Sequence, residues 1–168
     1  QLIQEANTET LQSLRTSHKA LMQCALHCHT LKANSKQGEA QEQVFIGDSM
    51  EIALVGMARK SLADVDNPLL PVIDEVPFDT ERKRMSTLHQ IDGSLRLYTK
   101  GAMECVLPLC EQILTFEGIQ TLTEQDRENI AAAQNALAEE GLRVLALAYR
   151  DVPSGYKYSD LETHLVFA

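Results

Sequence analysis

The chain has 168 residues, of which 44% are hydrophobic, and its 24 acidic and 15 basic residues give a formal net charge of −9. This balance fits a globular domain with its own core and argues against a general nucleic-acid or anionic-membrane surface, so any anion site must be local. The sequence contains no apolar run long enough to span a membrane, and its first residues lack the cationic and apolar regions of a signal peptide, so we expect neither feature. Four cysteines in a chain that does not need disulfides favour a reducing cytosol.

The first part of the chain predicts two helices. Apolar residues recur at a period near 3.6 over residues 8 to 33, and a polar loop and a short apolar run, Val44 to Ile46, follow. Asp48 is a natural N-cap for a second helix, "SMEIALVGMARKSLA", in which Glu51 occupies the third helical position.

The chain then predicts strands joined by tight turns. The segment "PVIDEVPF" is one strand, and its prolines indicate a sheet edge. Two further strands, "RMSTLHQI" and "SLRLYTK", flank Asp92-Gly93, which is the strongest short hairpin signal.

The remaining elements predict a short helix, a second hairpin, a long helix and a strand. The short helix is "AMECVLPLC", and "QILTF" and "IQTLT" flank a turn at Glu117-Gly118. Thr123 caps a helix rich in Ala, Glu and Gln that ends at Gly141. The strand "LRVLALAYR" follows, and a loop leads to a last short strand. Because strands joined by tight turns pair antiparallel, we expect an α/β fold in a single domain, with a mainly antiparallel twisted sheet flanked by helices.

The stretch "VPFDTERKRMS" places Phe78 close to three consecutive cations, Arg82, Lys83 and Arg84. An aromatic ring can stack on a nucleotide base for roughly 1–3 kcal/mol, and cations can donate charge-assisted bonds to phosphate for roughly 1.5–3 kcal/mol each. Equally, Phe78 can belong to the core and the cations to a solvated strand end.

A second cluster is Lys100-Gly101 at the end of a predicted strand. Glycine lets a ligand approach the backbone, beside a mobile lysine charge, and the amides of the short helix that follows point to the same place. The alternative is an ordinary strand-to-helix turn.

Two single residues also allow two interpretations. Glu51 can close a capping box with Asp48, or accept a hydrogen bond from an exocyclic amine such as that of adenine. Arg143 is the only cation within "LRVLALAY". Strand alternation puts it on the face opposite its apolar neighbours, where it can meet either solvent or a ligand.

The cluster "CALHCH" supplies four potential metal ligands, Cys24, His27, Cys28 and His29. A helix here splits them between faces, and no second ligand pair follows at zinc-finger spacing. A non-enzymatic metal-sensing or interaction domain built on this cluster is nevertheless the alternative function. No Walker-type loop, nucleophile elbow or HExxH motif occurs.

The order and spacing of four segments, "GDSMEIALVGMARK", "VPFDTERKRMS", "YTKGAMECVL" and "EEGLRVLALAYR", resemble the nucleotide-binding (N) domain of P-type cation-transporting ATPases. The resemblance covers about residues 44 to 150 and is to the calcium-pump-like and sodium-pump-like branch. It implies that Phe78 stacks on adenine and that Glu51 faces the adenine amino group. It also implies that Lys83 and Lys100 line the pocket near the base and the phosphates.

The same resemblance implies that Gly101 and Ala102 keep the pocket floor narrow and that Arg143 reaches phosphate oxygens. Two positions depart from the family pattern. Met103 stands where proline is usual, and Thr80 stands where calcium pumps have a basic residue, so a phosphate contact from residue 80 is in doubt.

The resemblance implies that residues 1 to 168 are a single N domain excised from a larger membrane ATPase. Both ends would then lie near the hinge to the phosphorylation domain. The D-K-T-G-T motif is absent, so the fragment is expected to contain no catalytic residue, to bind ATP weakly and not to hydrolyse it. Mg²⁺ is expected only with the missing phosphorylation domain. The expected partners are ATP and the phosphorylation and actuator domains of the same polypeptide, with no nucleic acid and a monomeric isolated domain.

The whole protein would then be a translocase in which this domain, on the cytoplasmic side of an integral membrane protein, positions the γ-phosphate for transfer to an Asp. A third interpretation is an ATP-binding regulatory domain that meets no phosphorylation site.

Overall fold

The computed structural model describes residues 19–34, 44–62, 68–115 and 117–168. Internal contacts divide the chain into two compact units, Gln1–Leu69 and Leu70–Ala168. Among the described residues, no helix has the length and apolar character needed to cross a membrane.

The first unit contains two helices and a small sheet. Helix α2 (Lys19–His27) packs against α3 (Ser49–Ser61), and β1 (Lys32–Asn34) pairs antiparallel with β2 (Val44–Ile46). Asp48 caps α3 as predicted, because its carboxylate accepts the N–H groups of Met50 and Glu51 at 2.9 and 3.2 Å.

The predicted helix over residues 8 to 33 is wrong at its C-terminal end, and residues 8 to 18 lie outside the described residues. Helix α2 ends at His27 and residues 32–34 form a strand. The N–H of Thr30 donates to the Glu51 carboxylate at 3.1 Å, so it does not continue the helical ladder. Just after the helix ends, the Glu51 side chain, which is distant in the sequence, accepts the backbone N–H that a longer helix would pair with its own carbonyl.

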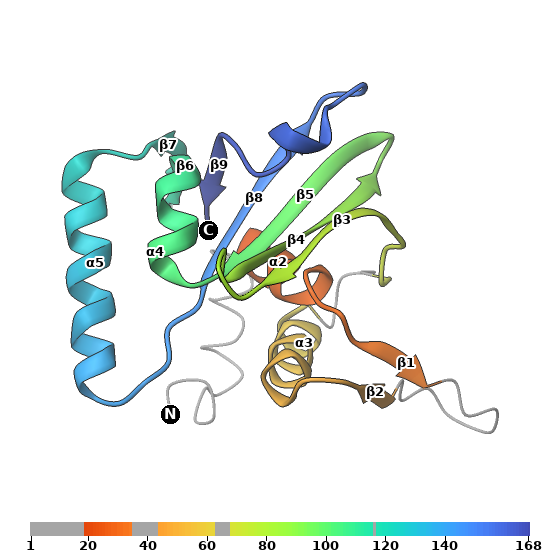
Figure 1. Ribbon diagram of the computed structural model, residues 1–168, viewed down its shortest axis with the longest axis horizontal. Coiled ribbons are helices and arrows are strands. Elements are labelled where there is room, and N and C mark those ends of the chain that lie inside the picture. Colours follow the sequence, from red (N-terminus) through yellow and green to blue (C-terminus); the bar gives the residue numbers. More distant parts are fainter. Residues whose placement is uncertain (1–18, 35–43, 63–67, 116) are drawn as a thin grey trace. The chain divides into compact units, whose positions relative to one another are not determined.

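The second unit is built on a mixed sheet of seven strands (Figure 1). In chain order the strands are β3 (Val72–Asp79), β4 (Arg84–Ile91), β5 (Ser94–Gly101), β6 (Cys110–Thr115), β7 (Gly118–Thr121), β8 (Ala146–Val152) and β9 (Leu165–Phe167). Their order in the sheet is β3-β4-β5-β8-β9-β6-β7. The pairs are antiparallel except β6 with β9, which is parallel. The α/β class and the mainly antiparallel sheet are confirmed.

Local turn chemistry sets the register of the β4–β5 hairpin. Asp92 and Gly93 have φ angles of 49° and 82°, and Ile91 lies opposite Ser94, as a two-residue turn with two positive φ angles requires. The predicted edge position of β3 is also confirmed.

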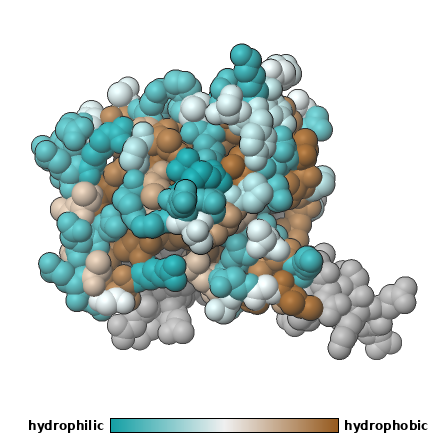
Figure 2. Space-filling model, viewed as in Figure 1, coloured by the Kyte–Doolittle hydropathy of each residue, from teal (hydrophilic) through white to brown (hydrophobic). Residues whose placement is uncertain are grey.

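Four helical segments accompany this sheet: α4 (Met103–Val106), η1 (Leu107–Leu109), α5 (Glu124–Glu139) and η2 (Tyr158–Asp160). A capping box joins Thr123 to Asp126 at the start of α5. None of the α5 residues is fully buried, and the surface over this helix is largely hydrophilic (Figure 2). Arg127 anchors α5 by donating to the carbonyls of Leu107 and Cys110 at 2.8 and 2.6 Å.

The core of the second unit lies along one face of the sheet. Leu88 and Leu97 face each other across β4 and β5, and both are fully buried. The other members are Val76, Met103, Val106, Cys110, Leu122, Ala146, Ala148, Val152, Leu161 and Leu165.

The strand predicted over residues 142 to 150 begins only at Ala146. Gly141 ends α5 as predicted, with φ 78°, and the N–H of Leu142 still donates to a helix carbonyl, that of Leu137, at 3.0 Å. Arg143 is therefore an exposed residue in the connection before β8, and its predicted place on a strand face is wrong.

Candidate functional site

The strand registers bring most of the predicted site residues to one end of the sheet. Arg84, at the start of β4, lies opposite Asp79 on one side and Gly101 on the other, and Gly101 lies opposite Ala146. The end of β3, the start of β4, the end of β5 and the start of β8 therefore meet there (Figure 1). The predicted residues carried by these segments are Phe78, Lys83, Lys100, Gly101, Ala102 and Arg143.

Phe78 is an exposed aromatic residue near the end of the edge strand β3. Its side chain is 58% exposed, so the alternative that it belongs to the core is wrong. It lies where the register shifts, because β3 advances from Val76 to Asp79 while β4 advances only from Ser86 to Arg84. Such a bulge redirects side chains, and here it leaves a large apolar ring in solvent.

The three consecutive cations do not act as one group. Arg82 Nη1 and Arg84 Nε both lie against the same oxygen, Oε2 of Glu162, at 2.7 and 2.8 Å. Only Lys83 of the three is exposed, and it pairs at 3.2 Å with Glu104, whose side chain is also more than half exposed. Since exposed pairs are weak, Lys83 is the cation of this stretch that a ligand can recruit most easily.

The connection between β3 and β4 is built from its own polar groups. The Asp79 carboxylate accepts the N–H groups of Glu81 and Arg82 at 2.8 and 2.9 Å, and these bonds, that of Arg82 foremost, lower the pKa of Asp79. The N–H of Lys83 donates to the carbonyl of Asp79 at 2.7 Å, and Lys83 itself has φ 48°. The turn thus holds Lys83 in a left-handed conformation that is uncommon for residues other than glycine.

Gly101 is required by the close approach of two strands. A Cβ at Gly101 would lie 2.5 Å from the Cβ of Arg84 and 2.6 Å from the carbonyl oxygen of Lys83. The next residue, Ala102, donates its N–H to that same carbonyl at 2.9 Å and is the N-cap of α4. The glycine therefore has a structural reason in this fold, and it ties the β5 end directly to the turn of Lys83.

Two predicted residues are buried. Lys100 is 6% exposed on β5, between Met85 of β4 and Leu147 of β8, and so it is not the mobile charge that the sequence indicated. Glu51 belongs to the first unit and is also 6% exposed. Its Oε2 accepts the N–H and the hydroxyl of Thr30 at 3.1 and 3.0 Å, a partner that neither sequence-based interpretation foresaw.

The metal-sensing alternative finds no support in the first unit. Over the described ranges of the chain, no three His, Cys, Asp or Glu side chains come together as a metal site. His29 Nδ1 accepts the N–H of Leu31 at 3.2 Å, and its ring packs edge-on against Phe45. All four cysteines lie within the described residues and are thiols.

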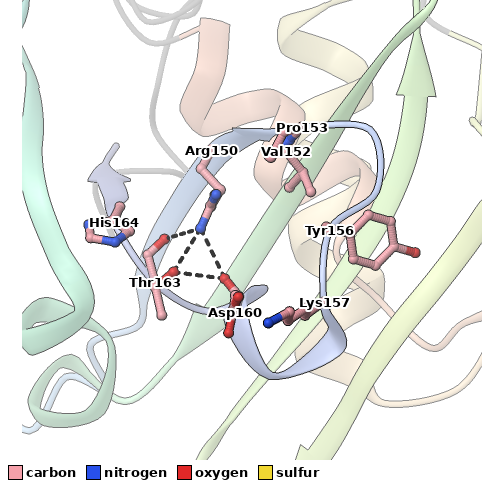
Figure 3. A pocket seen from close by; sticks show the side chains of 8 residues that line it. All are labelled: Arg150, Val152, Pro153, Tyr156, Lys157, Asp160, Thr163 and His164. Atoms are coloured by element: carbon pink, nitrogen blue, oxygen red, sulfur yellow. Dashed lines mark hydrogen bonds between the residues drawn. The ribbon is translucent and has the colours of Figure 1, made fainter.

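A cavity of about 330 Å³ lies beside β8 and the segment that follows it (Figure 3). Its lining contains none of the predicted site residues; it consists of Arg150, Val152, Pro153, Tyr156, Lys157, Asp160, Thr163 and His164. Arg150 Nη1 donates to the carbonyls of Asp160 and Thr163 at 3.0 and 2.7 Å and to the Thr163 hydroxyl at 2.8 Å. The arginine therefore fastens the returning segment to β8.

Comparison with known proteins identifies the family to which the chain is related. The family model described as "P-type ATPase, cytoplasmic domain N" matches residues 17–168. The chain is 40% identical over 124 residues, 72% of its length, to calcium-transporting ATPase 1 of Bacillus cereus. It is 31% identical over 153 residues (88%) to the cation-transporting ATPase pma1 of Synechocystis, and 36% identical over 122 residues (66%) to human plasma membrane calcium-transporting ATPase 1.

The chain spans only 14%, 16% and 10% of these three relatives, respectively. The chain belongs to the family of P-type ATPase cytoplasmic N domains.

Proposed function

We propose that this chain binds ATP with its adenine stacked on Phe78. The observation that carries the proposal is an aromatic ring that is 58% exposed at the bulged end of β3, close in sequence to the exposed cation Lys83. Exposing the apolar surface of this ring to water is unfavourable, and a planar nucleotide base that stacks on the ring would cover that surface. Within the described residues, no group of three potential metal ligands supports the metal-sensing alternative.

The other predicted residues take supporting roles in this proposal. Lys83 and Lys100 would line the pocket near the base and the phosphates, Lys100 from its buried position on β5. Gly101 and Ala102 would form the floor, and Arg143, exposed before β8, would reach phosphate oxygens. We keep Glu51 as the acceptor for the adenine amino group. Its observed bonds with Thr30 mean that adenine must share a carboxylate that already has a partner.

In the whole protein we propose that this domain positions the γ-phosphate for transfer to an Asp in a separate phosphorylation domain, which powers cation transport across a membrane. The contribution of this domain is positioning, since bond making occurs elsewhere. Two of the three relatives are calcium-transporting by name, which supports calcium as the transported cation. The phosphorylation and actuator domains would be its partners in the same polypeptide.

The isolated chain should bind ATP weakly. One stacking contact and a few partly solvated polar contacts must offset the lost freedom of the ligand, which leaves roughly −4 to −6 kcal/mol, or high micromolar to millimolar affinity. Mg²⁺ should change this affinity little, because its expected ligands belong to the phosphorylation domain.

The test is a calorimetric or NMR titration of the 168-residue chain with ATP, beside Phe78→Ala. We expect weak saturable binding that the substitution reduces at least about fivefold, the loss of one base-stacking contact. Ile119→Ala is the matched control, because Ile119 is 50% exposed on β7, at the other edge of the sheet. Equal affinity in Phe78→Ala, or binding that requires Mg²⁺, would contradict the proposal.

A further inference from the structure

Glu162 is the residue on which the cationic stretch converges. We infer that Glu162 is a positioning residue for the nucleotide site: by holding Arg82 and Arg84 together it fixes the turn that presents Lys83. This inference rests on the proposed function and extends it to a residue beyond the segments that resemble the family motifs.

The carboxylate of Glu162 is fully engaged on both oxygens. Oε2 accepts Arg82 Nη1 at 2.7 Å and Arg84 Nε at 2.8 Å, and Oε1 accepts the Ser86 hydroxyl at 2.8 Å. The Glu162 side chain is only 10% exposed. Its ion pairs are therefore screened less by solvent than surface pairs, and charge-assisted bonds of this kind are the stronger ones.

The segment that carries Glu162 is itself held on both sides. Leu161 is 1% exposed in the core cluster. On the other side, the backbone carbonyl and hydroxyl of Thr163 accept Arg150 Nη1 at 2.7 and 2.8 Å (Figure 3). The carboxylate is thus a fixed point, and the arginines are placed relative to the core through it.

The two arginines flank Lys83 in the sequence, so one carboxylate holds both neighbours of this residue. Between them, Lys83 keeps its φ of 48°, and its carbonyl accepts the N–H of Ala102 at 2.9 Å. A lysine in the left-handed region is retained only where the surroundings hold it there. Glu162 supplies that restraint from a distant part of the chain and leaves the Lys83 side chain exposed.

Glu162 also determines how much positive charge the site offers. If the Glu162 carboxylate were removed, Arg82 and Arg84 would lose the anion that pairs with them, and their positive charges would be available beside the proposed phosphate path. A charge effect alone would therefore tighten ATP binding, whereas loss of positioning would weaken it. The sign of the change separates the two roles.

The experiment measures the ATP dissociation constant of the 168-residue chain for Glu162→Gln, Lys83→Ala and the double variant. We expect Glu162→Gln to weaken binding by roughly 2- to 30-fold, the range of couplings transmitted through packed contacts. The double variant should bind no more weakly than Lys83→Ala alone, because both changes act on the same turn. Glu111→Gln is the control, since Glu111 forms an exposed pair with His164.

Arg82→Gln provides a milder second variant in case Glu162→Gln fails to fold. The Arg82 side chain is 31% exposed, and the pair between Arg84 and Glu162 stays in place. It should also weaken ATP binding, but because it removes a cation, the readout that reports positioning is the NMR amide signal of Ala102, which bonds to Lys83 and should move in both variants.

Unchanged or tighter ATP binding in Glu162→Gln and Arg82→Gln would overturn the inference, and so would losses that add fully to that of Lys83→Ala. If the unsubstituted chain binds ATP through Phe78 while these variants bind equally well, only the role of Glu162 is wrong. If the unsubstituted chain binds no ATP, the proposed function and this inference both fail.

Discussion

Gly101 lies where neighbouring segments leave no room for a side chain at the proposed site. Its neighbours are the start of β4 and the carbonyl of Lys83, both within 3 Å of where a Cβ would be placed. Gly56 offers a contrast, because it lies in helix α3 and nothing lies within 4 Å of its missing Cβ. The same substitution should therefore have opposite effects at the two glycines.

We expect Gly101→Ala to destabilise the fold by about 1–3 kcal/mol, the cost of forcing an extra methyl group into a packed site. Gly56→Ala should stabilise it by about 0.5–1 kcal/mol, since alanine favours the helix and restricts the unfolded chain. Urea unfolding followed by circular dichroism measures both. A Gly101→Ala chain as stable as the unsubstituted one would contradict the steric role of this glycine.

At the scale of elements, α5 depends on its ends more than on burial. None of its residues is fully buried, so the capping box at Thr123 and Asp126 and the anchor at Arg127 account for much of its order. Hydrogen bonds from the Thr123 side chain and backbone lower the pKa of Asp126. A carboxylate with a lowered pKa stabilises the folded chain above its unfolded pKa, and this contribution is lost as the pH falls through the folded pKa.

Thr123→Ala should cost about 1 kcal/mol of stability near pH 7, the usual value of an N-cap. The difference from the unsubstituted chain should narrow as the pH falls below the ordinary Asp pKa of about 3.9 and through the lowered pKa of Asp126, because Asp126 then becomes protonated and no longer accepts these bonds as a carboxylate. Urea unfolding over this pH range measures it. Gln125→Ala, in the same turn but without a capping role, is the control, and an equal loss there would contradict the role of the cap.

At the scale of the whole molecule, the four thiols report on the packing of both units. Cys24, Cys28 and Cys110 are buried, and Cys105 is intermediate. Burial raises the pKa of the Cys110 thiol to about 12. Because only the thiolate reacts, Cys110 should be inert in the folded chain near neutral pH.

Iodoacetamide at about pH 8 should alkylate Cys105 first in the folded chain and all four cysteines in urea, because the buried thiols react only after opening. Mass spectrometry of digests taken over time measures this, and Cys105→Ser should remove the fast phase. Labelling of Cys110 as fast as that of Cys105 would show that the core around it opens readily.

Several local features of this fold are determined by sequence patterns that span only a few residues. The cap at Asp48, the turn at Asp92-Gly93 and the cap at Thr123 each satisfy backbone groups of the same segment, so the sequence alone predicted them. The order of the motifs likewise indicated the family to which the chain belongs. The nucleotide roles of Phe78 and of the other site residues stay predictions.

Only the tertiary structure decided the features that join distant segments. Glu162 pairs with Arg82 over a sequence separation of 80 residues, and Glu51 bonds to Thr30 over a separation of 21. No local sequence pattern predicts either contact. In the same way β9 enters the sheet between β8 and β6, parallel to β6, after a long connection. Such contacts depend on how whole strands pack. The Glu162 carboxylate can pair with Arg82 only after packing of the core has brought their two segments together.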